Sequence, residues 1–382
     1  MGDLTTDLLC FGNPLLDMIL RVEDGQLLTK YRLLPDNQIE ADDDQKALFD
    51  EVFARSGEVT FCPGGCAQNT ARIYRWILGD RSSVSFVGAV GADKFGQRLE
   101  KLVRADGVNT RYVVHEDRPT GRAVSLVWGT NRSLVADLGA ATLCRPDRVF
   151  SPHNLALLTG AQFVYIEGFF VTHDPETAVQ VARYCSHSGR RLVFSLSGTY
   201  VCERHTSTIC QLLPHVSFLF GHVTELTALA RALGLEDEFD ISPLGYARLL
   251  DAASTRLNTV EAMTQSDEPD QPADQALLNG DSPGQLRIIV TQSADPVLLL
   301  DDVSVVSVPV PAIDERQIVD TTGAGDAVVG GFLAGQFLGE SLEDSVRYGV
   351  LAAREVVQAL GCSIPARRHP LTEPPLTNGV AS

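Results

Sequence analysis

The chain has 382 residues, 44% of them hydrophobic and 21% charged, which is typical of a folded globular protein. Its net charge of −18 argues against nucleic acid or an anionic membrane as the main partner, although a small anionic ligand needs only a local positive patch. No apolar stretch is long enough to span a bilayer and no signal peptide opens the chain, so we expect a cytoplasmic protein, with an additional nuclear pool as an open alternative.

The first part of the chain combines an α/β unit with segments that lack the alternation of strands and helices. Strands over 7–12 and 84–88 enclose a segment, 67–78, whose apolar residues have helical spacing. Segments at about 18–62 and 111–139 contain short strand-like alternations instead. Because these segments flank the helical unit on both sides, we expect them to form a small β lid.

From residue 163 onward, strands and helices alternate regularly. We predict strands over 163–166, 191–196, 218–220 and 287–290, and helices over 176–186, 205–213 and 225–233. Such alternation is typical of a mainly parallel sheet covered by helices on both faces, so the predicted fold class is α/β, as one unit over 1–382. Residues 258–285, rich in Asp, Gln, Pro and Gly, have no periodicity and are predicted to form a flexible acidic surface loop. In open α/β sheets the ligand lies outside the carboxyl ends of the strands, where a lid would cover it.

The segment Asp320-Thr-Thr-Gly-Ala-Gly-Asp326 precedes an apolar helical run, 327–334. The N–H groups of Gly323, Ala324 and Gly325 should therefore lie unpaired at a helix N-terminus and form an anion hole for a phosphoryl group. A carboxylate at Asp326 suits such a site if it accepts a proton from a hydroxyl that attacks the phosphorus. The alternative is a glycine-rich turn in which Asp326 only caps the helix. The length of the motif, DTTGAGDAxxGGF over 320–332, favours the catalytic interpretation.

This motif resembles the C-terminal signature of the ribokinase-type carbohydrate and nucleoside kinases. Further segments, in order along the chain, resemble the adenosine kinases of that family: Gly12-Asn-Pro-Leu-Leu-Asp17, Pro63-Gly-Gly-Cys-Ala-Gln-Asn69, Pro119-Thr-Gly121, Asn131-Arg-Ser-Leu134, Gly168-Phe-Phe170 and Leu219-Phe-Gly221. The resemblance implies a ribokinase-like three-layer α/β/α core with a lid. It also implies a monomer that phosphorylates the 5′-hydroxyl of adenosine to AMP, with ATP as co-substrate and Mg²⁺ as cofactor.

The resemblance also assigns roles to matching residues. Asp326 is implied to be the catalytic base, beside the anion hole formed by the three preceding residues. Asp17 is implied to bind the ribose 2′- and 3′-hydroxyls, which suits a carboxylate that can accept from two vicinal hydroxyls. The other implied adenosine contacts are Asn13, Gln38, Gly64, Gly65, Asn69, Leu134 and Phe170. For Leu134 and Phe170, ordinary core packing is the alternative.

Two implied roles concern the nucleotide. Arg132 would offer positive charge to the phosphates, or else be a solvated lid residue. Glu225 would order Mg²⁺ through water. The chain departs from the family near these positions, with His222 in place of an asparagine and Ser293 in place of a glycine. Another nucleoside or sugar kinase and a nucleoside-binding pseudokinase therefore stay open as alternatives.

Overall fold

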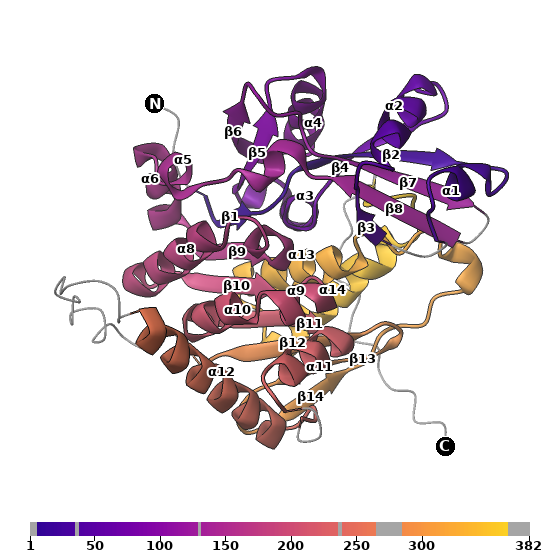
Figure 1. The fold of residues 1–382 in the computed structure, drawn as a ribbon. Coiled ribbons are helices and arrows are strands. Elements are labelled where there is room, and N and C mark those ends of the chain that lie inside the picture. Colours follow the sequence, from indigo (N-terminus) through magenta and orange to yellow (C-terminus); the bar gives the residue numbers. More distant parts are fainter. Residues whose placement is uncertain (1–5, 35–37, 129–130, 236–238, 265–284, 366–382) are drawn as a thin grey trace, which may run out of the picture.

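The protein is represented by a computed structural model, which describes residues 6–34, 38–128, 131–235, 239–264 and 285–365 (Figure 1). In these ranges, nine strands form one sheet in the order β14-β13-β12-β11-β10-β9-β1-β5-β6. Their bounds are β1 (Leu8–Phe11), β5 (Val84–Gly91), β6 (Asn109–His115), β9 (Phe163–Glu167), β10 (Arg191–Ser195), β11 (Val216–His222), β12 (Arg287–Gln292), β13 (Asp295–Leu300) and β14 (Val305–Val308). Pairing is parallel from β6 to β12 and antiparallel between β12, β13 and β14. The α/β fold class is confirmed.

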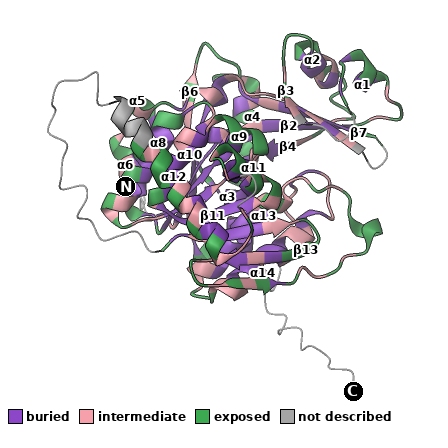
Figure 2. Cartoon of the chain, turned by 60° about the horizontal axis from the view of Figure 1, so that its bottom comes forward, coloured by how far each residue is buried: buried purple, intermediate pink, exposed green. Residues whose placement is uncertain are grey.

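Helices cover both faces of this sheet. They are α3 (Cys66–Leu78), α4 (Lys94–Ala105), α5 (Pro146–Val149), α6 (Pro152–Gly160), α7 (Gly168–Val171), α8 (Pro175–Ser188), α9 (Thr199–Arg204), α10 (Thr206–Leu212), α11 (Val223–Ala232), α12 (Pro243–Thr264), α13 (Ala324–Phe337) and α14 (Leu342–Val356). Alternate residues of β1 enter different cores: Leu9 and Phe11 pack in one, Leu8 and Cys10 in the other. Because successive strand residues point to opposite faces, the sheet separates two helical layers, and its strands are largely buried (Figure 2).

A second sheet lies at the upper right of Figure 1, in the order β3-β8-β7-β2-β4. Its elements are β2 (Leu15–Arg21), β3 (Gln38–Glu40), β4 (Thr60–Gly64), β7 (Arg122–Trp128) and β8 (Asn131–Asp137), with helices α1 (Gln26–Lys30) and α2 (Lys46–Ala54). We refer to this unit as the lid. One face of its sheet packs Met18 and Val124 against Leu48 and Phe49 of α2 in a separate small core.

Three sequence-based expectations need correction. Residues 109–115, placed largely in the lid, form β6 and pair with β5 in the large sheet. The lid is not purely β, because α1 and α2 lie within its first segment. Residues 258–264 are the end of α12 rather than loop, and the remainder of the predicted acidic loop, 265–284, lies outside the described residues.

The packing of α13 determines where the glycine loop lies. A Cβ on Gly331 would come within 2.6 Å of Gly349 Cα in α14, and one on Gly330 within 2.9 Å of Thr70 O in α3. The small residues of the GGF motif therefore let α13 contact α14 and α3 backbone to backbone. This contact brings the N-terminus of α13 beside that of α3.

Candidate active site

The start of α13 is built by Gly323, which has φ of 80° as the N-cap residue and adopts the left-handed backbone that glycine tolerates best. The N–H groups of Gly323, Gly325 and Asp326 have no hydrogen-bond partner among the described residues. The expectation for Ala324 was wrong, because its N–H donates to Thr321 O at 3.2 Å. The unpaired N–H groups at this helix N-terminus are therefore those of Gly323, Gly325 and Asp326, and an anion hole formed by them stays a prediction.

Asp326 is held in place by the N-terminal half of α3. Its Oδ2 accepts a hydrogen bond from Asn69 Nδ2 at 2.9 Å, and Asn69 Oδ1 in turn accepts from Arg72 at 3.0 Å. The guanidinium of Arg72 is buried and also pairs with Asp106 at 2.6 Å. Asn69, predicted as a ribose contact, therefore orients the carboxylate of Asp326 in this conformation.

Burial raises the pKa of Asp326 to about 6, while hydrogen bonds from Asn69 and Cys66 and the charge of Arg72 oppose the rise. A carboxyl group with this pKa is ionised at neutral pH and is more basic than an ordinary aspartate. Both properties suit a general base, whose pKa should lie near the working pH.

Asp17 lies in β2 against the backbone of β4. A Cβ on Gly64 would fall 2.0 Å from Asp17 Oδ1, so only glycine leaves space for this carboxylate. Asp17 is only 8% exposed, and no described residue donates a hydrogen bond to its carboxylate. Burial raises the pKa of Asp17 to about 7, with the charges of Arg72 and Arg132 opposing the rise. A carboxylate in this recess can accept hydrogen bonds from hydroxyl groups of a ligand.

Asn13 lies in the loop between β1 and β2. Its Nδ2 donates to Phe169 O at 3.1 Å, whereas its Oδ1 is buried without a partner among the described residues. Its backbone oxygen lies against Gly65, where φ is 90° and a Cβ would come within 2.1 Å. Asn13 therefore presents an unused buried acceptor, as expected of a residue that contacts a polar ligand.

Glu167, at the end of β9, was not identified from the sequence. One carboxyl oxygen accepts from Asn13 N at 2.7 Å and the other from Ala67 N at 2.5 Å. Burial raises the pKa of Glu167 to about 8, while the two backbone N–H donors oppose the rise. Glu167 thus joins the loop after β1 to the start of α3. A lone acidic residue at a strand end was the available signal in the sequence.

Further predicted site residues, Gln38, Arg132 and Leu134, belong to the lid. Ala123 of β7 pairs with Asp17 on one side and with Ala136 on the other, so these three residues share one face of the lid sheet. Because every second residue of a strand points to the same face, Leu134 and Arg132 of β8 also lie on the face of Asp17. The backbone of Gln38 pairs with that of Leu134. Leu134 is half-buried, on the face opposite the small lid core.

Arg132 reaches from the lid to the glycine loop. It donates to Thr322 Oγ1 and lies 3.7 Å from Asp320 Oδ1. Asp320 also accepts from Thr322 N at 2.9 Å and from Gly361 N at 2.9 Å. The positive charge of Arg132 is therefore next to the predicted phosphoryl site, rather than on a solvated surface.

For Phe170 the structure shows core packing, which was the alternative to a contact with adenosine. Its side chain is fully buried and packs on Phe11, with ring centroids 6.3 Å apart, so it belongs to the core and offers no surface to a ligand in this conformation. The adjacent Phe169 is partly buried and stacks on Tyr200, with ring centroids 6.0 Å apart and planes 24° from parallel. This aromatic pair lies next to Asn13, whose amide contacts Phe169 O.

Glu225 lies in the first turn of α11, where its Oε2 accepts from His222 N at 2.8 Å. Within the described ranges, no three His, Cys, Asp or Glu side chains are grouped so that they could hold a metal ion. A single carboxylate with water as the link fits Mg²⁺, which is commonly held by nucleotide phosphates and water with one or two protein carboxylates.

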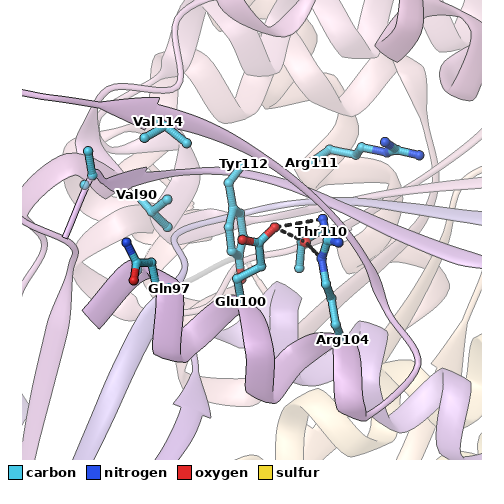
Figure 3. A pocket seen from close by; sticks show the side chains of 11 residues that line it. Val90, Gln97, Glu100, Arg104, Thr110, Arg111, Tyr112 and Val114 are labelled. Carbon is cyan, nitrogen blue, oxygen red and sulfur yellow. Dashed lines mark hydrogen bonds and ion pairs between the residues drawn. The ribbon is translucent and has the colours of Figure 1, made fainter. Parts of the chain in front are cut away.

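A separate cavity of about 440 Å³ lies between α4 and β6 (Figure 3). None of the predicted site residues lines it. Tyr112, in its wall, donates to Gln68 Oε1 at 2.5 Å, and Gln68 Nε2 donates to Gly64 O at 2.7 Å. This cavity is therefore distinct from the site, although one wall is hydrogen-bonded to it.

The chain is similar in sequence and in fold to known kinases. The family model for pfkB family carbohydrate kinases matches residues 36–368. The chain is 33% identical to adenosine kinase 2 of Arabidopsis thaliana over 94% of this chain and 96% of the relative, and 32% identical to adenosine kinase of Saccharomyces cerevisiae over 96% and 98%. Among solved structures it is similar to Anopheles gambiae adenosine kinase in complex with P1,P4-di(adenosine-5) tetraphosphate, with a TM-score of 0.76, 34% identity and coverage of 94% and 97%. Schistosoma mansoni adenosine kinase in complex with adenosine in an occluded loop conformation gives a TM-score of 0.76 at 26% identity, with coverage of 93% and 96%.

Proposed function

The chain belongs to the pfkB family of carbohydrate kinases, and we propose that it transfers the γ-phosphoryl group of ATP to the 5′-hydroxyl of adenosine, giving AMP. Curated relatives over nearly the whole chain are adenosine kinases. The observation that carries the proposal is the placement of Asp326, a carboxylate with a raised pKa beside unpaired N–H groups at one helix N-terminus of the described chain. A base and an anion site at one point are what phosphoryl transfer to a hydroxyl requires.

Each residue of the candidate site has a separate role in the proposed reaction. Asp17 accepts the ribose hydroxyls in its glycine-walled recess, and Asn13 binds the base. Asp326 accepts the 5′-hydroxyl proton as that oxygen attacks the phosphorus. Asn69 occupies one of the acceptor positions of the Asp326 carboxylate and leaves others for the substrate.

Charge on the transferred group is stabilised by the N–H groups of Gly323 and Gly325, together with the guanidinium of Arg132. The Mg²⁺ that accompanies ATP supplies charge neutralisation of the phosphates, and Glu225 would hold it through water. A monomeric state and a cytoplasmic location stay predictions. In the described part of the chain, no helix is long and apolar enough to cross a membrane.

The test is Asp326→Asn. The amide keeps the size of the side chain but cannot take up a proton, so turnover of adenosine should fall by about 10²–10⁴ while adenosine affinity changes little. Turnover is followed by coupled ADP release and affinity by calorimetry. Asp251→Asn, at an exposed position on α12, is the control and should leave both unchanged. An Asp326→Asn protein that keeps half of its activity would contradict the assignment.

The same assay separates the alternatives. A pseudokinase would bind adenosine without consuming ATP at saturating Mg²⁺. Another nucleoside or sugar kinase would turn over a different acceptor faster than adenosine in a substrate panel.

A further inference from the structure

Arg72 is a buried arginine in the middle of α3, outside the set of site residues predicted from the sequence. It is only 3% exposed. Its Nε donates to Asp106 Oδ2 at 2.6 Å, and its Nη1 donates to Pro63 O at 3.2 Å, Cys362 O at 3.0 Å and Asn69 Oδ1 at 3.0 Å. Burial of a guanidinium is costly unless its donors are paired, so these partners indicate what the charge does in the fold.

Three of the partners hold the guanidinium of Arg72 in place. Asp106 follows α4, Pro63 lies in β4 of the lid, and Cys362 lies near the end of the described chain. Because these acceptors come from separate segments, the side chain of Arg72 has a fixed direction. The fourth partner, Asn69, lies about one turn earlier on α3. The fixed guanidinium can therefore in turn fix the side chain of Asn69.

Arg72 determines which way the amide group of Asn69 faces. A guanidinium has donors only, so the end of the amide that faces it must be the oxygen. The NH₂ group then faces Asp326, whose Oδ2 accepts from Asn69 Nδ2 at 2.9 Å. With the amide turned over, two donors would face each other at Arg72 and two acceptors at Asp326. Arg72 thus keeps a donor against the carboxylate of Asp326.

The positive charge of Arg72 also acts on Asp326. Burial raises the pKa of this carboxyl group, and hydrogen bonds from Asn69 and Cys66 and the charge of Arg72 oppose the rise. Arg72 is the one cation among the groups that shift this pKa in the described structure. The other ionisable groups that interact with Asp326 are acids, namely Asp17, Cys66, Tyr165, Glu167 and Cys362.

We propose that Arg72 is a positioning residue for the kinase reaction, which orients the carboxylate of Asp326 through Asn69 and keeps it ionised through its charge. The inference rests on the proposed function and adds a residue that acts without touching the substrate. The alternative is a structural role, in which Arg72 only ties α3 to its neighbours. A structural role would affect the stability of the protein but not the pH dependence of turnover.

A double-mutant cycle on turnover tests the link between Arg72 and Asn69. The kcat of the full-length protein is measured from pH 5 to 9 by coupled ADP release for wild type, Arg72→Met, Asn69→Ala and the double variant, and is divided by the folded fraction from thermal unfolding. On the plateau at high pH, Arg72→Met should lower kcat by about 10- to 100-fold, because a displaced base is poorly aligned with the hydroxyl. The double variant should be no slower than Asn69→Ala, because the orientation of Asp326 is lost once.

The pH dependence separates the charge of Arg72 from its geometry. The kcat falls on the acidic side where Asp326 becomes protonated, so this limb reports the pKa of the base. Arg72→Met removes a charge that opposes the rise in pKa, so the limb should move to higher pH by about one unit. Arg72→Lys keeps a positive charge but not the planar fork, so the limb should stay near its wild-type position while the plateau falls. If Arg72→Met does not fold, Arg72→Lys replaces it in the cycle.

The matched control is Arg81→Met. Arg81 is an exposed arginine just after α3 that donates to Leu78 O at 3.2 Å, and its loss should change neither the plateau nor the acidic limb. Effects on the plateau that multiply in the double variant would show that Arg72 does not act through Asn69. A plateau and a limb that equal those of wild type in Arg72→Met would show that Arg72 only stabilises the fold.

These outcomes are distinguishable from failure of the proposed function. If wild type turns over another acceptor faster than adenosine, the cycle is measured with that acceptor, and a plateau without multiplication then contradicts the proposed substrate alone. If wild type phosphorylates adenosine and Asp326→Asn is inactive, but the effects on the plateau multiply, the inference about Arg72 alone is wrong.

Discussion

Asp17 is a buried carboxyl group whose ionisation should depend on its ligand. Burial raises its pKa to about 7, so near neutral pH the free protein contains both protonation states. Ribose hydroxyls donate to the ionised form, which they therefore stabilise. Adenosine should bind with release of a proton, and its affinity should fall by about tenfold from pH 8 to pH 6.

Calorimetry of adenosine binding between pH 6 and 8.5 measures this dependence. The ligand 2′,3′-dideoxyadenosine is the control, because it has no hydroxyls for Asp17 and should bind independently of pH. Equal pH profiles for the two ligands would show that Asp17 does not contact the ribose.

Glu167 should matter for stability more than for chemistry. Its two oxygens accept from two backbone N–H groups, and a glutamine can accept with only one oxygen while its NH₂ faces the other N–H. Above pH 8, where the carboxyl group with its pKa of about 8 is mainly ionised, Glu167→Gln should lower the free energy of unfolding by about 1–3 kcal/mol, measured by urea denaturation. Glu116→Gln, at an exposed position, should have no such effect. Equal stability of the Glu167 and Glu116 variants would mean that the buried donors find other partners.

The pKa of Glu167, Asp17 and Asp326 is raised in each case, so the folded protein retains protons that the unfolded chain releases. Where the folded state binds more protons, stability falls with rising pH. The contribution of these groups to stability therefore declines between about pH 4 and pH 8. Burial of these carboxyl groups therefore lowers the stability of the protein at neutral pH. The same burial raises their pKa and makes them more basic.

At the scale of elements, the position of Asp326 depends on how closely α13 approaches its neighbours. A side chain at Gly331 would overlap Gly349 Cα and Tyr348 O, because its Cβ would lie only 2.6 Å from each of them. These are backbone atoms of α14 and cannot move separately from that helix. Any displacement of α13 also shifts Asp326 relative to Asn69 in α3.

Gly331→Ala should therefore destabilise the protein by about 1–3 kcal/mol and lower turnover. Urea denaturation and the kinase assay measure the two effects. Gly25→Ala is the control, because a Cβ at Gly25 meets no atom within 4 Å. Unchanged stability of Gly331→Ala would contradict the close backbone contact between α13 and α14.

At the scale of the whole molecule, Asp320 joins three parts of the fold. Its carboxylate contacts Arg132 of the lid, Thr322 of the glycine loop and Gly361 near the end of the described chain. A lid that approaches the loop through Arg132 brings positive charge to the phosphoryl site and covers it from water.

Removal of the contact that Arg132 makes with Asp320 and Thr322 should loosen the lid. Arg132→Ala should raise the amide exchange rate of β8 by about two- to fivefold, as expected for a partly exposed ion pair, and raise the KM for ATP. Hydrogen–deuterium exchange with mass spectrometry measures the first effect. Arg21→Ala, at an exposed position at the end of β2, should leave both unchanged. Identical exchange in the Arg132 and Arg21 variants would show that Arg132 does not hold the lid.

Local patterns in the sequence determined the α/β class, most strands and helices of the large sheet, and the chemistry expected at Asp326. Apolar periodicity and glycine spacing are properties of neighbouring residues, so they are visible without the fold. The assignment of β6 failed because an alternating strand has the same pattern at the edge of a large sheet as in a small lid.

Only the tertiary structure determined which of two adjacent phenylalanines is buried. The same holds for the contacts of Glu167, which joins the loop after β1 to the start of α3, and for the contact between His222 and Ser293 at the ends of neighbouring strands. It also decided that Ala324 N–H is paired while its neighbours in the described chain are not. Each of these depends on contacts between segments far apart in the chain or on the local path of the backbone. Side-chain type and spacing do not encode such contacts, because they arise only when the sheet order and the helix packing bring the segments together.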